Sequence, residues 1–447
     1  MPSGIGGPGG FSATTASATT YLNLTSANGA LKELYDDQKV QNLVYKNNPA
    51  LALIRKNTDF EGKYKPVPLV FAPAAGRSSN FSVAWTAGGS VVSGGTIGGA
   101  QGAPYIQEFL ITRATDYAIA TIDRQTLMAS RSNAGAFIQM SKVNVDGAIR
   151  AITNSLSTSL FRAGTGTIAQ TSAAGFSSGV ATLQNVNDIV QFEVNMALVA
   201  STGDGSGAVT GANTTMYVIA VDRTAGTVTV SASPGGAAGL PAGLSSATQY
   251  YLQVAGDYNA KLTGFAGWVP SLALAATTLA PGYNFFNVDR SQDKVRLGGF
   301  RYDGSNFSIE EALIDGSNYL AREGGMPDVG ITNFASYSAL VKALGSKIQY
   351  IDAEVAEIAF KGVQIHGATG PIRIFPDRSC NQFTCYLLTM DTWALDSLDD
   401  APHIQTDHVT GEMLRVYNAD AAELRVSYYA QTECNAPGWS ANILLGA

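Results

Sequence analysis

The sequence predicts a protein of the α+β class that is organised around one long helix. Residues 133–164 show a single apolar stripe with helical spacing, a glycine-rich hairpin-like stretch precedes them, and a block of short alternating segments follows. Helices and strands then mix until the end of the chain. At 1.5 Å per residue the helix would be about 45 Å long, so we expect it to serve as a spine for the parts fastened to it.

The composition favours a protein that is a subunit of an obligate assembly. Charged residues make up 14% of the 447 positions, against about 25% in typical soluble domains, while hydrophobic residues make up an ordinary 45%. Obligate interfaces are depleted in Lys, Glu and Asp, so we expect partners to cover much of this weakly charged surface. The net charge of −7 and the lack of a basic run argue against direct, phosphate-dominated binding of nucleic acid.

Cysteine usage and hydropathy point to a reducing compartment. The three cysteines, Cys380, Cys385 and Cys434, contain no CxxC motif, so we expect buried free thiols rather than a disulfide framework or a zinc site. The first residues show neither a basic n-region nor an apolar h-region, and no apolar run reaches the roughly 18–20 residues of a membrane helix. We expect the chain to be made and kept in the cytoplasm of its producer.

The N-terminal region is expected to be an arm. Residues 1–20 are mostly Gly, Ser, Thr and Ala, a composition that normally stays disordered, so a neighbouring subunit is expected to hold them. Residues 28–45 carry a loose helical stripe that Asn48-Pro49 ends, and residues 50–55 add a short apolar turn.

Residues 60–121 are expected to form a two-stranded extension. Residues 63–71 look extended and contain two prolines, which confine them to a sheet edge or a free arm. Residues 78–85 and 105–121 alternate, and the Gly-, Ser- and Val-rich residues 87–102 make a flexible tip. An isolated hairpin is marginal in water, so this extension is expected to lie on something. A short helix at 122–130 then leads to the spine.

This extension carries the first candidates for contacts between subunits. Its charged residues are islands in a neutral stretch, and each either pairs with acidic groups of a neighbour or faces solvent. Its aromatic residues are candidate apolar anchors, because aromatic side chains dominate the energetics of interfaces. The charged candidates are Lys63, Lys65, Arg77, Glu108 and Arg113, and the aromatic candidates are Phe81, Trp85, Tyr105 and Phe109.

The spine is expected to begin at Asn133, a good N-cap residue, and to end at Gly164, which can adopt a left-handed conformation. One face packs on the subunit's own sheet. The polar remainder is free to contact the arm of another subunit, and Lys142, Asp146 and Arg150 are candidates for that contact. The apolar stripe consists of Ile138, Val145, Ile149, Ile152, Leu156 and Leu160.

Residues 165–287 are expected to form an inserted, small all-β domain. They are rich in Gly, Ala, Thr and Val, with turn signals about every ten residues, which is typical of a small antiparallel barrel or sandwich. The alternating segments are 186–198, 216–230 (a strand, a turn and a second strand), 250–254 and 261–269.

The last part of the chain mixes helices and strands. Ser308 caps a helix that Gly324-Gly325 ends, and a short strand at 328–333 precedes a helix at 334–344. Further strands are expected at 363–375 (two strands around a turn), at 386–395, and at 414–417 and 422–431 as a terminal hairpin.

No motif predicts catalysis, a cofactor site or a metal centre. The glycines of residues 4–9 spell GxGxxG, but no strand precedes them. Residues 175–179 spell a nucleophile elbow without the flanking strand and helix, so a loop serine is expected. His403, Asp407 and His408 lack metal-ligand spacing, and a solvated loop is favoured over a weak ion site. We therefore expect no enzyme activity, no cofactor and no metal.

The order of elements resembles that of the major capsid proteins of tailed bacteriophages, the Hong Kong 97-like fold. In that family an N-terminal arm and an extended loop precede a spine helix in a peripheral domain; an axial domain follows, and the chain returns to the peripheral sheet. Residues 313–344, LIDGSNYLAREGGMPDVGITNFASYSALVKAL, look like the axial helix–strand–helix. Residues 370–395, which include GPIRIFPDRSC and YLLTMDTWAL, look like the axial strands that pass to the peripheral domain.

The resemblance divides the chain into six parts, of which the inserted domain departs from the minimal fold. They are the N-terminal arm (1–58), the extended loop (59–114), the peripheral domain with the spine helix (115–164), the inserted β domain (165–287), the axial domain and its connections (288–395), and the return to the peripheral domain (396–447).

The resemblance implies a structural protein whose copies assemble into hexamers and pentamers of an icosahedral head around double-stranded DNA. It implies portal and scaffolding proteins as partners, and decoration proteins in some members. It also implies no sequence-specific DNA binding, no membrane, and a place in the virion after assembly in the host cytoplasm. Two other functions stay open. The shell of an encapsulin-type compartment uses the same fold, and a Thr/Gly-rich adhesin would explain the insert but lacks a signal peptide.

Overall fold

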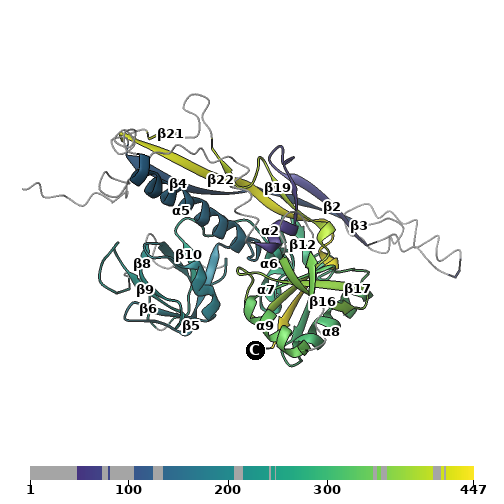
Figure 1. Ribbon diagram of the computed structural model, residues 1–447. Coiled ribbons are helices and arrows are strands. Elements are labelled where there is room, and N and C mark those ends of the chain that lie inside the picture. Colours follow the sequence, from purple (N-terminus) through teal and green to yellow (C-terminus); the bar gives the residue numbers. More distant parts are fainter. Residues whose placement is uncertain are drawn as a thin grey trace, which may run out of the picture. The chain divides into compact units, whose positions relative to one another are not determined.

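A computed structural model shows most of the chain as α+β structure (Figure 1). It forms two compact units; among the described residues the smaller contains 118–149 and 404–426, and the larger contains the rest. The predicted helix at 28–45 and strand at 78–85 lie largely or wholly outside the described residues. The structure describes residues 48–72, 79–80, 105–123, 134–205, 215–240, 243–246, 248–345, 350–353, 360–405, 414–416 and 419–446.

The predicted spine is helix α5 (Ala134–Leu160). Its stripe positions from Val145 to Leu160 are buried, as the helical spacing predicts, while the side chain of Ile138 is not among those described. The helix stops at Leu160 rather than at Gly164. The amides of Phe161 and Arg162 bond to carbonyls three residues back, which tightens and ends the last turn. Gly164 has a φ of 84°, the left-handed conformation expected of it.

A six-stranded sheet surrounds the long strand β22 (Ala421–Cys434). The short helix α2 (Pro49–Leu53) leads into β1 (Arg55–Asn57), which pairs in parallel with β19 (Trp393–Ser397). Strand β19 in turn pairs antiparallel with β22. Three further strands pair with β22: β4 (Ala114–Asp123), β20 (His403–Ile404) and β21 (Leu414–Arg415), the last confirming the predicted terminal hairpin.

The predicted extension is an antiparallel pair of strands, β2 (Lys65–Ala72) and β3 (Tyr105–Ile111), which lie side by side in Figure 1. The register runs from Lys65 opposite Ile111 to Ala72 opposite Tyr105. The single strand predicted at 105–121 is wrong in one respect. The ladder with β2 ends at Ile111, and the chain continues as β4 in the sheet of β22. Strand β4 also includes the first two residues of the helix predicted at 122–130, whose remainder lies outside the described residues.

Residues 167–254 close into an antiparallel barrel with the strand order β10-β5-β6-β9-β8-β7. Its interior is filled by large side chains such as Phe176, Phe192 and Tyr250. The barrel agrees with the prediction of short antiparallel strands. Its strands are β5 (Thr167–Ser177), β6 (Val180–Leu183), β7 (Ala197–Ser201), β8 (Met216–Asp222), β9 (Thr227–Ser231) and β10 (Tyr251–Val254).

Two segments predicted as strands in this block are helical instead. Residues 186–198 begin with the 3-10 helix η1 (Val186–Gln191), and residues 261–269 contain helix α6 (Phe265–Trp268). All four residues of α6 are buried, so the apolar run at 265–269 reflects burial on every side and not the alternation of a strand. The all-β prediction for 165–287 therefore fails after the barrel. Helix α7 (Leu272–Thr278) and the pair β11 (Asn284–Phe285) and β12 (Val288–Asp289) complete this stretch.

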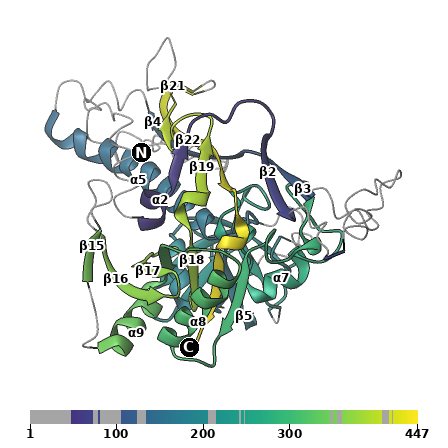
Figure 2. The same cartoon turned by 90° about the vertical axis from the view of Figure 1, so that its right-hand side faces the viewer.

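A seven-stranded sheet forms the second large core, with the order β13-β23-β18-β14-β17-β16-β15. Helices α8 (Ile309–Arg322) and α9 (Phe334–Leu344) pack against it (Figure 2). Ser308 caps α8 in a capping box with Glu311, which explains why this boundary is legible in the sequence. The strands are β13 (Phe300–Gly304), β14 (Val329–Thr332), β15 (Tyr350–Ala353), β16 (Phe360–Gly367), β17 (Gly370–Pro376), β18 (Thr384–Leu388) and β23 (Ala441–Leu445).

The last strand, β23, lies in a different sheet from β22, the strand before it. Strand β23 pairs in parallel with β13 and antiparallel with β18, so the chain ends in the seven-stranded sheet. Within 396–447, β22 therefore lies in the six-stranded sheet and β23 in the seven-stranded sheet, and the assignment of the whole segment to the peripheral domain stays a prediction. A parallel partner about 140 residues away along the chain leaves no local signal for a sequence reading to use.

Candidate assembly surface

The base of β2 is fixed to the six-stranded sheet by one lysine and two carboxylates, which we call the root cluster: Lys65, Asp396 and Glu433. Lys65 Nζ lies 2.7 Å from Asp396 Oδ1 and 2.6 Å from Glu433 Oε2. Asp396 on β19 and Glu433 on β22 are both buried. Asn57 of β1 donates a further hydrogen bond to Asp396 Oδ1 at 3.0 Å. Lys65 is thus engaged inside its own subunit, whereas the sequence suggested a contact with a neighbour.

The electrostatics of the root cluster are dominated by burial. Desolvation raises the pKa of Glu433 to about 7, and its hydrogen bond with Asp396 acts in the same direction, while Lys65 opposes both. The two carboxylates conversely raise the pKa of Lys65, more than offsetting its own partial burial. The cluster contains two carboxylates and one ammonium group in a buried position, where an unpaired charge is destabilising. The protonation state of the carboxylates therefore affects how strongly β2 is bound to the sheet.

Phe109 anchors β3 in the interior of its own subunit. Its side chain has no exposed surface, and its ring lies edge-on to Trp268, with centroids 5.1 Å apart, and 6.2 Å from Phe285. The guanidinium of Arg290 sits 3.8 Å over the Phe285 ring on the same cluster. Phe109 was predicted to contact a neighbouring subunit. Its side chain instead packs inside its own subunit, so that prediction is wrong.

Arg113 is also used internally. Its Nη1 donates a hydrogen bond to the carbonyl of Phe60 at 3.1 Å, and its guanidinium lies 5.1 Å over the Phe60 ring. Phe60 itself is fully buried. Arg113 therefore fixes the segment that enters β2 to the segment that leaves β3, instead of reaching a neighbour as the sequence suggested.

The opposite side of the strand pair carries the surface that remains uncovered, which we call the outer face: Pro66, Pro68, Val70, Ile106 and Glu108. Val70 and Ile106 are directly opposite each other in the ladder and each is 56% exposed. The prolines have no N–H. Leu110, opposite Pro66, donates to the carbonyl of Phe286 and not toward β2, so Pro66 and Pro68 face the free edge of β2, which lacks donors at both positions. This edge is therefore poorly suited to adding another strand, and the outer face offers apolar side-chain contacts instead.

The other predicted contact residues have mixed outcomes. Lys63 is exposed, with its Nζ 5.0 Å over the Tyr64 ring; Glu108 and Arg150 are exposed, and Asp146 is half-buried. The sequence analysis missed Val70, Ile106, Asp396 and Glu433. For Val70 the sequence did contain a signal, because the run KPVPLVF has apolar residues on both faces of a short strand. Arg77, Phe81 and Trp85 lie outside the described residues, and the side chains of Tyr105 and Lys142 are not among those described.

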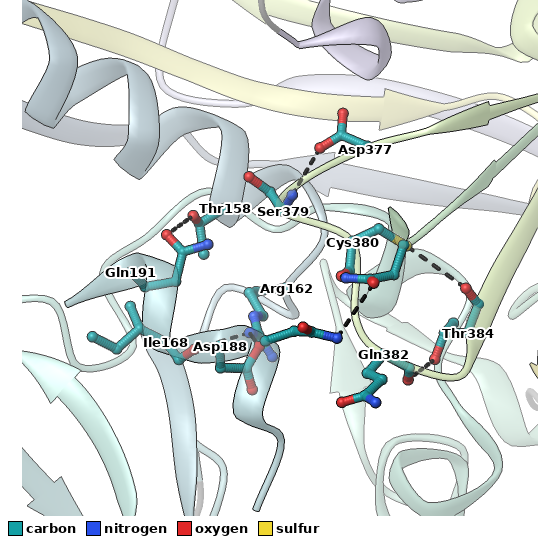
Figure 3. Close-up of polar contacts among 12 residues, drawn as sticks. Thr158, Arg162, Ile168, Asp188, Gln191, Asp377, Ser379, Cys380, Gln382 and Thr384 are labelled. Carbon is teal, nitrogen blue, oxygen red and sulfur yellow. Dashed lines mark hydrogen bonds and ion pairs between the residues drawn. The ribbon is translucent and has the colours of Figure 1, made fainter. Parts of the chain in front are cut away.

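Figure 3 shows how the end of α5 is tied to the barrel. Arg162 donates from Nη2 to the carbonyl of Ile168 at 2.9 Å and to Asp188 Oδ1 at 3.1 Å. Thr158 donates to Gln191 Oε1 at 2.7 Å, so two consecutive turns of chain hold η1 of the barrel. Burial raises the pKa of Asp188 even though Arg162 lies beside it. The barrel is thus attached through buried polar contacts as well as by the chain itself.

A second polar cluster joins α5 to the loop after β17 and to the entry of α2. Ser157 Oγ lies 2.9 Å from Asn48 Oδ1 and 2.7 Å from Ser379 Oγ. The amide of Ser379 donates to Asp377 Oδ1 at 2.8 Å (Figure 3), and the amide of Ala50 donates to Oδ2 at 3.4 Å. Asp377 has no exposed surface, and this burial raises its pKa to about 6. Segments distant in sequence meet at this one carboxylate.

A cavity of about 520 Å³ lies beside the point where β3 passes into β4. Arg113, Lys261 and Arg290 contribute to its wall. Arg290 is fully buried and donates to the carbonyls of Gly267, Trp268 and Thr278, so it binds the C-terminal ends of α6 and α7. These contacts give Arg290 a structural role under Phe285.

No other chemistry emerges among the residues that the structure describes. They contain no group of three or more His, Cys, Asp or Glu side chains that could hold a metal ion. No helix among them is long and apolar enough to cross a membrane. The three cysteines are buried free thiols, and burial raises the pKa of Cys385 and Cys434 to about 12. Ser177, the serine of the elbow pattern, is the last residue of β5 and not a loop residue as expected, and the turn begins after it. His403 lies in β20, and Asp407 and His408 are outside the described residues.

The sequence matches no protein-family model and no curated protein. The fold is similar to the capsid protein of cyanophage A-1(L), with a TM-score of 0.48 and 10% identity over 94% of this chain and 96% of that one. An encapsulin complex from Synechococcus elongatus gives a TM-score of 0.41 and 6% identity over 94% and 91%. The procapsid of satellite phage P4 gives 0.37 and 10% identity over 95% of each chain. The structures similar to this chain thus include phage capsid proteins, the family that the order of its elements resembles.

Proposed function

We propose that this chain is a major capsid protein, a structural subunit whose copies assemble into hexamers and pentamers of an icosahedral head around double-stranded DNA. The observation that carries the proposal is the strand pair β2–β3. Its inner side is fixed by Phe109 and the root cluster, while the outer face leaves Val70 and Ile106 exposed. A surface of this kind serves a protein whose partner is another copy of itself.

The physical argument rests on how much support a two-stranded ribbon needs. Such a ribbon is marginal in water, because it buries little apolar surface of its own. Here one side is covered by the subunit, and the other presents a directly paired Val and Ile flanked by two prolines. Covering them with a second copy removes apolar surface from water without requiring any backbone pairing. The low charge content of the chain is consistent with such coverage.

The finer assignments follow from this proposal. Lys63 and Glu108 are exposed charges that would border the contact. On α5, Arg150 is exposed and Asp146, one turn before it, is half-buried, and we assign both to a contact with the arm of another subunit. We assign the barrel to an inserted domain, and we assign the protein to the virion after assembly in the host cytoplasm. Portal, scaffolding and decoration proteins would be its partners. The net charge of −7 suits a wall that encloses DNA without holding it.

The shell of an encapsulin-type compartment is the second candidate, because the same surface would serve it equally well. The content of purified particles separates the two. Particles produced in the native host would hold double-stranded DNA in the first case and a protein cargo in the second.

The assembly test replaces both exposed apolar residues of the outer face. We expect V70D/I106D subunits to stay folded and to form no shells by negative-stain electron microscopy, whereas the wild-type protein forms them. Two carboxylates placed in an apolar contact would have to be desolvated without a partner. V194D is the matched control, since Val194 is equally exposed, at 54%, but lies between η1 and β7 of the barrel. Normal shells from the double variant would refute this assembly surface.

A further inference from the structure

The root cluster has an unusual charge content for a contact that holds a projecting strand. Two carboxylates from adjacent strands, Asp396 on β19 and Glu433 on β22, share the single ammonium of Lys65. Asp396 has no exposed surface, and Lys65 and Asn57 both contact its Oδ1. Lys65 is the first residue of β2. The positive charge that balances Asp396 and Glu433 is therefore on a different strand from either carboxylate.

On the neighbouring strands β1 and β22, the residues beside the root cluster do not place a second cation where Lys65 lies. On β1, Asn57 donates to Asp396, Arg55 is in register with Ala394 on the same face of the sheet, and Lys56 is on the opposite face. On β22, Gln431 is in register with Asp396 and donates to the carbonyl of Thr112.

Other charged side chains near the base of β2 have contacts or positions outside the root cluster. Arg113, between β3 and β4, is hydrogen-bonded to Phe60, and Lys63 lies over Tyr64. On β3, Glu108 is exposed on the outer face, opposite Pro68. Within the part of the chain that the structure describes, Lys65 is thus the cation that contacts both carboxylates of the root cluster.

We propose that the root cluster is a proton-operated latch: proton uptake by the Asp396–Glu433 pair releases Lys65 and frees the base of β2 from the sheet, while Phe109 keeps β3 in place. Gly62, with a φ of 79° and open space where a Cβ would lie, stands just before β2 and gives the chain a pivot. Release at this one strand moves the β2 part of the outer face, Pro66, Pro68 and Val70, relative to the part on β3 that another copy would also contact.

The direction of the pH dependence follows from linkage. While Lys65 is seated, its charge favours the ionised form of Glu433. When Lys65 leaves, two buried carboxylates face each other without a cation, and one of them takes up a proton. Release therefore consumes a proton, so acid favours the released state and alkaline pH favours the seated one. The pKa of about 7 for Glu433 belongs to the state with Lys65 seated, so release becomes progressively less favourable as the pH rises above about 7.

The test measures hydrogen–deuterium exchange of the segment 61–70 in unassembled subunits at about pH 8 and about pH 5.5, after correction for the intrinsic pH dependence of exchange. Strands β8 and β9 of the barrel serve as the internal reference. In the wild-type protein we expect exchange of 61–70 to be severalfold faster at the lower pH, with the reference unchanged. E433Q should abolish this difference, and K65M should exchange fast at both pH values.

K63M is the matched control, because Lys63 is an exposed lysine just before β2 and should leave the wild-type response intact. A wild-type segment with the same corrected rate at both pH values would overturn the latch, and so would an E433Q variant that keeps the full response. Exchange in the reference strands verifies that each variant is folded. The readout needs no shell, so it stands or fails separately from the proposed function.

Discussion

Asp377 illustrates at the scale of one residue how burial can win against hydrogen bonding. Its carboxylate accepts from the amides of Ser379 and Ala50, and both bonds favour the charged form. Complete burial outweighs them and raises the pKa to about 6. The folded protein therefore keeps a proton on Asp377 under conditions in which the unfolded chain has lost it.

The sign of the resulting pH effect is definite. Between about pH 4 and about pH 6 the folded state binds more protons at Asp377 than the unfolded state, so this residue's contribution to the free energy of unfolding falls as pH rises, by on the order of 2–3 kcal/mol in total. Urea denaturation of the wild type and D377N across this range should show a difference that shrinks with pH. D400N, at an exposed carboxylate, is the control. A wild-type minus D377N difference that is independent of pH would contradict the assignment.

At the scale of an element, the turn between β5 and β6 shows why a short motif has to be read in its context. Residues 175–179 spell a nucleophile elbow in sequence, yet Ser177 pairs with Val180, so Ser178 and Gly179 form a two-residue hairpin turn. Both have positive φ, 51° and 81°, as a turn that matches the twist of its strands requires. Ser177, the serine of the motif, therefore ends a strand, and Ser178 belongs to the turn.

A matched pair of glycine substitutions tests the packing of this turn. A Cβ on Gly179 would lie 2.4 Å from the backbone nitrogen of Gly239, whereas a Cβ on Gly235, which also has positive φ, would meet nothing within 4 Å. We expect G179A to lower the free energy of unfolding by about 2–4 kcal/mol and G235A by about 1 kcal/mol. Equal effects in chemical denaturation would show that the contact with Gly239 can relax without cost.

At the scale of the whole molecule, the strand pair β2–β3 separates folding from assembly. Ala72 and Tyr105 are directly opposite each other, so an Asn-Gly turn can replace residues 73–104 without changing the register. We expect the shortened chain to fold with wild-type thermal stability, because Phe109 and the root cluster remain, and to form no closed shells. A variant carrying the same number of Gly and Ser residues in place of 73–104 distinguishes lost contacts from lost length. Normal particles from the shortened chain would show that residues 73–104 are dispensable.

The fold was predictable where a signal was local. Helices α8 and α9 follow from a capping residue, a period and a terminal glycine, and the pair β16–β17 follows from two alternating runs around a turn. The buried stripe of α5 follows from the spacing of its apolar residues alone. The failures share a cause. Helix α6 is too short to show a period, and β23 is defined by a parallel partner far away in the chain.

The candidate surface was predictable as a stretch but not side chain by side chain. The sequence by itself determined that the residues around 63–111 form a proline-bearing strand pair with a few charged and aromatic side chains in an otherwise neutral stretch, and that the chain as a whole has few charges. Only the tertiary structure decided that Phe109, Arg113 and Lys65 face inward while Val70 and Ile106 face outward. The reason is physical: alternation puts side chains on two faces of a strand, but which face is buried depends on the distant segments that cover it, here β19, β22 and the helix that carries Trp268.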